Sequence, residues 1–349
     1  MTPRLPRRLP AEWEPQAALL LAWPHESTDW ASSLNAIEPV YVNLVAATAA
    51  VQPVWLLCQD SAHIKHVDQL LQTAAVDSAN VRCIAIPYND TWIRDYGPLA
   101  VANGQDWRWL DFQFDGWGGK FAAELDNQVN RQLAATGFFD SNKVDSLKVT
   151  LEGGSIDTDG AGSLLTTDCC LLGASRNAGM KRADWEQLFA EQFGCDRILW
   201  LEAGYLSGDD TDGHVDTLAR FCSIDTIAYA GAGSDKSDPN HAELSRMAEQ
   251  IRGLRQRNGK PYQLIELPSA GALQSADGDW LPASYANFII INKRVLIPQY
   301  AVPADVEALQ QLQSAFPDRE IIGIDARAML AQGGALHCAT MQLAKEALI

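Results

Sequence analysis

The chain has 349 residues, of which 47% are hydrophobic and 20% are charged, so it can bury a large core and is not disordered over most of its length. Its 27 basic and 44 acidic residues give a formal net charge of −17, which argues against nucleic acids and anionic membrane surfaces as partners, because both are bound through Lys and Arg. This charge fits a small cationic substrate, although solubility is its more common cause.

We expect neither a signal peptide nor a membrane span near the N-terminus. Arg4, Arg7 and Arg8 are followed by two acids, and the longest apolar run, at positions 17–23, is far shorter than the roughly 20 residues of a membrane span. No small-residue cleavage site follows Trp23. Because the seven Cys residues lack paired spacing, we expect a cytoplasmic protein with reduced thiols rather than a secreted disulfide scaffold.

No Ser/Gly linker or charge block divides the chain, so we expect a single domain over residues 1–349. Apolar runs predict strands, and apolar spacings of three and four predict helices, in a strand, strand, helix, strand order that occurs four times. In chain order these units are 99–102, 107–114, 122–135 and 147–151; 163–167, 170–172, 181–193 and 198–201; 215–222, 227–230, 241–257 and 263–267; and 286–291, 295–298, 306–316 and 321–324.

The two ends of the chain can supply a fifth unit of the same order. Its elements are 336–342, 17–23, 39–50 and 54–58, with a helix at 62–75 and a strand at 81–86 in addition. A repeated element order without repeated sequence indicates internal pseudo-symmetry. The polar segments 89–98, 152–154, 208–216 and 333–338 all fall between such units, so a rotational arrangement would bring them together.

The first polar segment, NDTWIRDYGP at 89–98, places Asp90, Trp92, Arg94 and Asp95 in a loop closed by Gly and Pro. A carboxylate beside an aromatic ring suits a planar cation, because the carboxylate accepts two N–H bonds and the ring stacks on the plane. The alternative is an ordinary turn held by an Asp–Arg pair.

The second segment contains Glu152, which follows a predicted strand and precedes Gly153 and Gly154. Two adjacent glycines allow the backbone to approach a ligand closely. They are equally compatible with a tight turn.

The third segment, GDDTDGHVD at 208–216, is rich in oxygen and nitrogen ligands for a metal. It does not fit an EF-hand loop, because Gly208 and Ala219 would occupy positions that need acids. His214, Val215 and Asp216 open a predicted strand, so His214 and Asp216 project to the same face and can act as a general base and a cation anchor. A solvated acidic loop is the alternative.

The fourth segment places Cys338 just after Gly333 and Gly334, at the start of a predicted strand. Cysteine is the strongest nucleophile available at neutral pH when a nearby group ionises it. His337 alternates away from Cys338 on a strand, so His214 is the better candidate for its partner. The other cysteines lie in or beside predicted strands and fit structural thiols: Cys58, Cys83, Cys169, Cys170, Cys195 and Cys222.

Four short segments occur in this order along the chain: TWIRD followed by GP, then EGG, then GHVD, and finally GG followed by HC. Together they make the chain resemble the agmatine deiminase family. That family belongs with the Porphyromonas-type peptidylarginine deiminase-like enzymes in the guanidine-modifying pentein superfamily. The likeness starts at PAEWEP, residues 10–15, and covers nearly the whole chain. It implies an α/β fold, a five-bladed propeller of strand-strand-helix-strand modules around a pseudo-fivefold axis, with which the recurring element order agrees.

The resemblance implies hydrolysis of agmatine to N-carbamoylputrescine and ammonia, as a step in putrescine and polyamine synthesis. Cys338 would attack the guanidinium carbon, and His214 would act first as an acid and then as a base. Glu152 would orient His214, and Asp95 and Asp216 would grip the guanidinium nitrogens. The further candidates for substrate binding are Trp92, Asp90, Arg94 and Gly334. Neither a metal nor a cofactor is implied.

Three alternatives stay open. The same chemistry could convert peptidyl-arginine to citrulline. The acids at 208–216 could serve a metal-dependent hydrolase, or the chain could bind amino-guanidines without catalysis. The expected partner is a small cationic guanidine, without nucleic acid or membrane, and a homodimer is compatible with the sequence.

Overall fold

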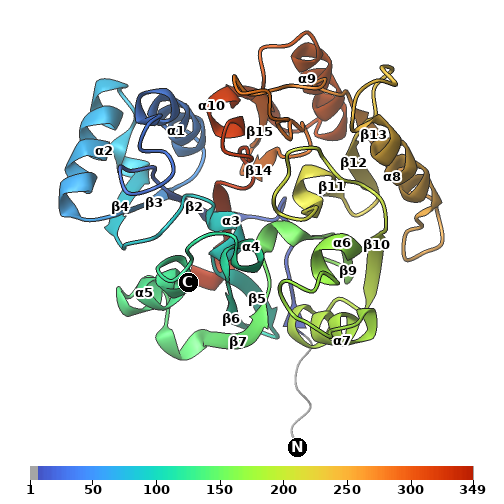
Figure 1. The fold of residues 1–349 in the computed structure, drawn as a ribbon. Helices are drawn as coiled ribbons and strands as arrows, with labels where there is room; N and C mark the ends of the chain where they lie inside the picture. Colours follow the sequence, from blue (N-terminus) through green and yellow to red (C-terminus); the bar gives the residue numbers. More distant parts are fainter. Residues whose placement is uncertain (1–6, 349) are drawn as a thin grey trace, which may run out of the picture.

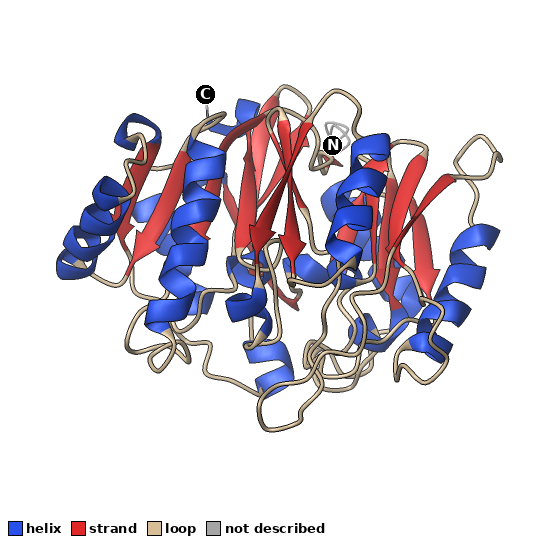
Figure 2. Cartoon of the chain, turned by 90° about the horizontal axis from the view of Figure 1, so that it is seen from above, coloured by secondary structure: helices blue, strands red, loops and turns tan. Residues whose placement is uncertain are grey.

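The computed structural model describes residues 7–348 and folds them into five small sheets accompanied by helices. In Figure 1 the sheets surround the centre of the molecule, and the longer helices lie toward its periphery. Figure 2 shows that the strands form one layer and that long loops gather beyond one end of it. Within the described residues, no helix has the length and apolar character needed to cross a membrane.

One sheet joins the two ends of the chain. Its elements are β2 (Gln16–Ala22), α1 (Leu34–Ala49), β3 (Val54–Cys58), α2 (Ser61–Thr73), β4 (Val81–Ala85) and β17 (Thr340–Ala344). β17 pairs antiparallel with β2, and the pairs β2–β3 and β3–β4 are parallel. Residues 18–22 of β2 are at most 1% exposed, as expected of a central strand that is covered on both faces.

The other four sheets each contain an antiparallel pair of strands followed by a parallel pair. An antiparallel pair needs only a turn, whereas a parallel pair needs a long crossover that usually contains a helix, so this pairing explains the recurring element order.

The elements of these four sheets, in chain order, are β1 (Arg7–Arg8), β5 (Leu99–Asn103), β6 (Asp106–Gln113), α5 (Val129–Ala135) and β7 (Val144–Thr150); β8 (Ile156–Thr158), β9 (Ser163–Thr167), α6 (Asp168–Leu171), α7 (Arg182–Phe193) and β10 (Arg197–Leu201); β11 (Ala219–Ser223), β12 (Thr226–Ala230), α8 (His241–Gly253) and β13 (Gln263–Leu267); and β14 (Ile289–Ile291), β15 (Arg294–Gln299), α9 (Ala304–Ala315), β16 (Glu320–Asp325) and α10 (Arg327–Leu330). Strand β1 pairs antiparallel with β5. Two further short helices, α3 (Ile93–Tyr96) and α4 (Gly116–Gly119), lie near the centre of Figure 1.

The strand predicted at 170–172 is wrong. Its first residues belong to helix α6, and the antiparallel partner of β9 is β8, which lies upstream. A short apolar run does not distinguish a buried strand from a buried helical turn.

The strand predicted at 215–222 is wrong in its first half. A 3-10 turn occupies Val215–Thr217, and the strand begins at Ala219. The Thr217 hydroxyl donates to the carbonyl of His214 at 2.9 Å and holds this turn. His214 and Asp216 therefore do not project from one face of a strand.

Two predicted helices are shorter than expected. The helix expected at 122–135 starts only at Val129, and the one expected at 241–257 ends at Gly253. Cys338 lies in the turn before β17 rather than at a strand start. The remaining predicted elements are confirmed with shifted ends.

Candidate active site

The four polar segments converge, as predicted, beside a cavity of about 360 Å³. The 3-10 turn Gly153–Ser155 packs against helix α3 on one side and against the 3-10 turn Val215–Thr217 on the other. Asp95 and Cys338 line the cavity. Glu152, His214 and Asp216 form a second layer in which no side chain has exposed surface.

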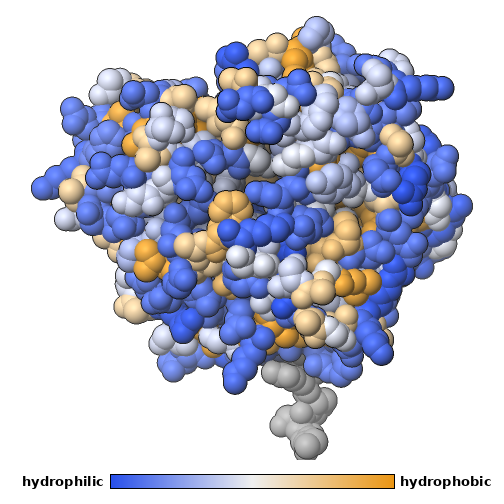
Figure 3. Space-filling view, viewed as in Figure 1, coloured by the Kyte–Doolittle hydropathy of each residue, from blue (hydrophilic) through white to orange (hydrophobic). Residues whose placement is uncertain are grey.

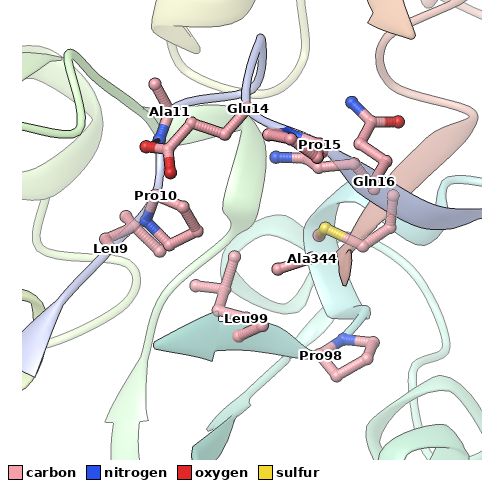
Figure 4. A pocket seen from close by; sticks show the side chains of 12 residues that line it. Leu9, Pro10, Ala11, Glu14, Pro15, Gln16, Pro98, Leu99 and Ala344 are labelled. Carbon is pink, nitrogen blue, oxygen red and sulfur yellow. Dashed lines mark hydrogen bonds between the residues drawn. The ribbon is translucent and has the colours of Figure 1, made fainter. Parts of the chain in front are cut away.

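A second pocket, drawn in Figure 4, has no part in this site. It lies between the segment Leu9–Gln16 and the start of β5, and it holds only about 20 Å³, roughly the space of one water molecule. None of the predicted site residues lines it. Its walls are mostly apolar, so we assign it to packing.

The Cys338 thiol is nearly buried, with 6% of the residue exposed. The amide of Asn287 donates to its sulfur at 3.1 Å, and an Asp216 oxygen lies 3.6 Å away. Burial, followed by the negative charges of Asp216 and Asp95, raises the pKa of the thiol well above its ordinary value. Without a bound cation the sulfur is therefore a neutral thiol at neutral pH.

His214 lies between two carboxylates. Its Nδ1 is 3.5 Å from Asp95 Oδ1 and its Nε2 is 3.5 Å from Glu152 Oε2. Burial lowers the pKa of His214, but the charge of Asp95 and the contacts with Cys170 and Glu152 outweigh it and hold that pKa well above its ordinary value. The flanking carboxylates thus favour the protonated ring, which can give up a proton.

Asp95 is held by two hydrogen bonds. Its Oδ1 accepts from the backbone N–H of Gly154 at 2.9 Å, and its Oδ2 accepts from the indole of Trp117 at 2.9 Å. Burial is the main cause that raises the pKa of Asp95 to about 6. Its carboxylate is therefore ionised at neutral pH but loses its charge in mild acid.

Asp216 has one occupied and one free oxygen. Its Oδ2 accepts from His337 Nδ1 at 2.7 Å, whereas its Oδ1 is buried without a hydrogen-bond partner. Burial raises the pKa of Asp216, but the bond from His337 and the positive charges of His337, His214 and Arg220 together outweigh it, so the pKa stays below its ordinary value. A charged, fixed carboxylate with an unused oxygen is suited to accept an N–H from a cation.

Gly154 has a specific steric role. A Cβ at this position would lie 2.6 Å from His214 Nδ1, 2.8 Å from Asp95 Oδ1 and 3.1 Å from Asp216 Oδ2. The two glycines lie in a tight 3-10 turn, and the backbone of Gly154 approaches the site side chains themselves.

Sequence reasoning missed Arg176. Its Nε donates to both oxygens of Glu152 at 2.7 and 2.8 Å, and its Nη2 donates to the carbonyl of Thr211 at 2.9 Å. Burial raises the pKa of Glu152, but His214 and Arg176 together hold it below its ordinary value. Arg176 lies in a loop outside the four segments, so no local signal in the sequence identified it.

His337 was predicted to point away from Cys338. In the structure its ring points toward Glu12. Its Nε2 lies 3.2 Å from Glu12 Oε2, and its Nδ1 bonds to Asp216. Glu12 also pairs with Arg220. Because both ring nitrogens face carboxylates, His337 links Asp216 to a buried network of charges that fixes its orientation.

The other predicted binding residues fall into two groups. Trp92, Asp90 and Gly334 line the cavity. Arg94 does not, because its Nε donates to the carbonyl of His337 at 3.3 Å, on the far side of the Cys338 turn. The structure thus gives no support to direct substrate contact by Arg94.

The acids at 208–216 do not gather around a common point. Asp209 accepts from the N–H of Gly213 at 2.7 Å, and Asp212 pairs with Lys120 and Arg176. Within residues 7–348, one group of His, Cys and carboxylate atoms is close enough for a shared ion: Glu152, Cys170 and His214. The Arg176 guanidinium against Glu152 opposes a cation there. These positions therefore favour thiol chemistry over a metal-dependent hydrolase.

The chain is similar to known deiminases along its whole length. The description of the Porphyromonas-type peptidyl-arginine deiminase family matches residues 8–344. A solved structure from Porphyromonas gingivalis, provisionally named an arginine deiminase, is 42% identical over 97% of this chain and 99% of that chain, with a TM-score of 0.90. A C. jejuni agmatine deiminase with a cysteine-to-serine change and substrate bound is 35% identical over 97% of this chain and 96% of that chain, with a TM-score of 0.88.

The agmatine deiminase of Stutzerimonas stutzeri is 29% identical, with 96% of this chain and 94% of that protein covered. The mixed α/β fold agrees with that of the two solved structures. Since the family description matches almost every described residue, the chain belongs to the Porphyromonas-type peptidyl-arginine deiminase family.

Proposed function

We propose that this chain is a hydrolase that converts agmatine and water to N-carbamoylputrescine and ammonia, with Cys338 as its nucleophile. One grouping carries the proposal: a cavity-lining thiol lies 3.6 Å from a carboxylate whose other oxygen is buried and free. A guanidinium presents planar N–H donors that match such carboxylates. The agmatine deiminases among its relatives support the same substrate.

The positions of these groups support the following reaction. The Cys338 thiolate attacks the guanidinium carbon and forms a C–S bond, while Asp95 and Asp216 hold the nitrogens. His214 gives a proton to the departing nitrogen, which leaves as ammonia, and an amidino-thioether remains on Cys338. Water then attacks this carbon and His214 takes its proton. The C–S bond breaks, its electron pair returns to sulfur, and the ureido product leaves.

Substrate binding itself controls the nucleophile. The negative charges of Asp216 and Asp95 hold the thiol neutral in the free protein. The single positive charge of a bound guanidinium offsets part of the negative field of the two carboxylates and so removes part of the barrier to ionisation of the thiol. The thiol proton leaves to solvent, because Asp216 keeps its negative charge and holds the cation. The reactive thiolate therefore forms when a cation occupies the site.

The cavity mouth favours agmatine over arginine. Its lining includes Asp29, Asp210, Asp277 and Asp279, and it contains neither Lys nor Arg among the described residues. The amine tail of agmatine is attracted to these acids, whereas the α-carboxylate of free arginine is repelled. In Figure 3 small apolar groups lie near the middle of a mostly hydrophilic face. Aromatic lining from Trp92, Trp117 and Trp280 can cover the methylene chain.

The same chemistry on peptidyl-arginine is the second candidate, because the matching family is described by that activity. An extended peptide would have to pass the acids at the mouth of the cavity. A peptide lacks the free amine that those acids suit, so agmatine is the better fit.

We further propose that the five sheets are the blades of one pseudo-fivefold α/β propeller that forms a single domain. The shared pattern of an antiparallel and a parallel pair supports this, as does the pairing of β17 with β2. Free thiols at all seven cysteines support a cytoplasmic location. A role in putrescine synthesis and a homodimer stay predictions.

The test is a product assay with agmatine, free arginine and an arginine-containing peptide, in which the ureido product is measured. We expect turnover of agmatine that Cys338→Ala abolishes and that a chelator leaves unchanged. Activity that survives Cys338→Ala but disappears with chelator would support the metal-dependent hydrolase instead. Turnover of the peptide without turnover of agmatine would support the second candidate.

A further inference from the structure

The short element α4 (Gly116–Gly119), which follows β6, has an unusual backbone. All four of its residues have positive φ, and Trp117 itself has φ 57° and ψ 49°. A residue with a Cβ rarely adopts this left-handed region, and a bulky aromatic residue there is an outlier. Strained residues of this kind concentrate at functional sites, where the surrounding structure holds them. Contacts around Trp117 must therefore outweigh the strain of its backbone.

The two glycines beside Trp117 allow this turn to form. A Cβ at Gly116 would lie 2.1 Å from the carbonyl oxygen of Phe121, and one at Gly118 would lie 2.7 Å from the Cβ of Ser175. Both positions therefore need glycine for space as well as for their positive φ. The segment is thus built to present one large side chain, that of Trp117, from a tightly packed backbone.

The indole ring of Trp117 is fixed between two aromatic rings. Phe114 and Phe121 contact it edge-on, with ring centroids 5.0 and 5.5 Å away and interplanar angles of 88° and 89°. Trp117 lines the substrate cavity, although only 5% of the residue is exposed. Its single polar side-chain group, the Nε1–H, donates to Asp95 Oδ2 at 2.9 Å. Because the ring is locked on both sides, the direction of this hydrogen bond is fixed.

The bond from Trp117 completes the support of the Asp95 carboxylate. The other oxygen, Oδ1, accepts the backbone N–H of Gly154 at 2.9 Å, so two donors from separate segments fix the plane of the carboxylate. A donor on a carboxylate also favours its charged form, and the bond from Trp117 opposes the burial that raises the pKa of Asp95. The other charged or titratable groups around Asp95 are His214, Asp216, Glu152, Arg94 and Cys338.

We propose that Trp117 is a positioning residue, whose indole N–H holds the Asp95 carboxylate in the orientation and the charged form that grip the substrate cation. The role rests on the proposed function, in which Asp95 binds a guanidinium nitrogen. The left-handed turn Gly116–Gly119 places the indole for this purpose. Each carboxylate oxygen can accept two hydrogen bonds, so both oxygens of Asp95 keep capacity for the substrate. Trp117 thus acts through Asp95 and takes no part in making or breaking bonds.

The test is Trp117→Phe, which keeps an aromatic ring at this position but removes the N–H donor. The kcat/KM for agmatine is measured from pH 5 to 8. The pKa of Asp95 is followed without substrate by ¹³C NMR of aspartate-labelled protein, in which Asp95→Asn identifies the signal. We expect the acid limb of kcat/KM and the pKa of Asp95 to move up by about one pH unit. At pH 8, kcat/KM should fall about 10- to 100-fold.

The direction of the shift separates this role from simple packing. If the smaller ring only admitted water, burial of Asp95 would decrease and its pKa would fall rather than rise. The matched control is Trp200→Phe, which removes an indole N–H that donates to Glu186 Oε1 at 3.1 Å, away from the cavity. This control should keep the pH profile and the kcat/KM of the parent protein.

An unchanged or lowered pKa of Asp95 in Trp117→Phe would overturn the proposal. If circular dichroism shows that this variant does not fold, Gly116→Ala replaces it, because the added Cβ displaces the turn from Phe121 while the indole is kept, and the same upward shift is expected. If the parent fails to turn over agmatine while the pKa of Asp95 still depends on Trp117, the proposed substrate is wrong and the positioning role of Trp117 stands.

Discussion

Gly154→Ala should damage both the catalytic geometry and the stability of the fold. The added Cβ would lie 2.6 Å from His214 Nδ1, where an ordinary contact begins at 3.4 Å, so one group must move by 0.8 Å (3.4 − 2.6). The Asp95 and Asp216 oxygens, at 2.8 and 3.1 Å, must also give way. Misplacement by about 1 Å costs about 10²-fold in rate. Overpacking of a core costs about 1–3 kcal/mol of unfolding free energy.

Steady-state kinetics with agmatine and urea unfolding measure the two effects. The matched control is Gly253→Ala at the end of α8, where an added Cβ meets nothing within 4 Å and where alanine favours the helix. Its kcat/KM should equal that of the parent. Parent-like kinetics in Gly154→Ala would refute the close packing of Gly154, His214 and Asp95 on which the site assignment depends.

Three further predictions concern charge. The kcat/KM for agmatine should fall below an apparent pKa of about 6, because burial raises the pKa of Asp95 to that value and its protonated form cannot hold the cation; a pH profile that is flat from 5 to 8 would contradict this. Arg176→Met should lower the unfolding free energy by about 3 kcal/mol in urea titrations, because the buried Glu152 loses the nearer of its two positively charged partners and keeps only His214, and adding Glu152→Gln should recover part of that loss without restoring activity. Asp279→Asn at the cavity mouth should raise KM for agmatine and weaken its salt dependence with little change in kcat, and an unchanged KM would argue against attraction of the amine tail.

The sequence predicted the order of elements well where periodicity is informative. The run at 17–23 became a central strand, and the spacing at 181–193 became helix α7. The prediction failed at 170–172, where the apolar run is too short to show a helical or strand period. It also failed near Thr217, where a side-chain hydrogen bond determines the backbone conformation. Such local bonds override the preference of Val215 and its neighbours for a strand.

The prediction of the site residues also succeeded where the local sequence was informative and failed where it was not. Cys338, His214, Asp95, Asp216 and Glu152 were identified because they lie in short polar segments at equivalent junctions, and the structure brings them together. Arg176, Asn287 and Glu12 were missed because each acts from a distant segment, and only the tertiary fold brings it to its partner. Arg94 was expected at the substrate because it lies next to Asp95, but successive residues of a helical turn point in different directions, and its guanidinium lies elsewhere.

The central claim is that Cys338 carries the amidino group of agmatine during turnover. Rapid acid quenching of the reaction with agmatine, followed by peptide mapping, tests it directly. The account predicts an amidino adduct on the peptide that contains Cys338, together with ureido product, and neither with Cys338→Ala. Ureido product formed without any adduct, at an undiminished rate in Cys338→Ala, would contradict the account.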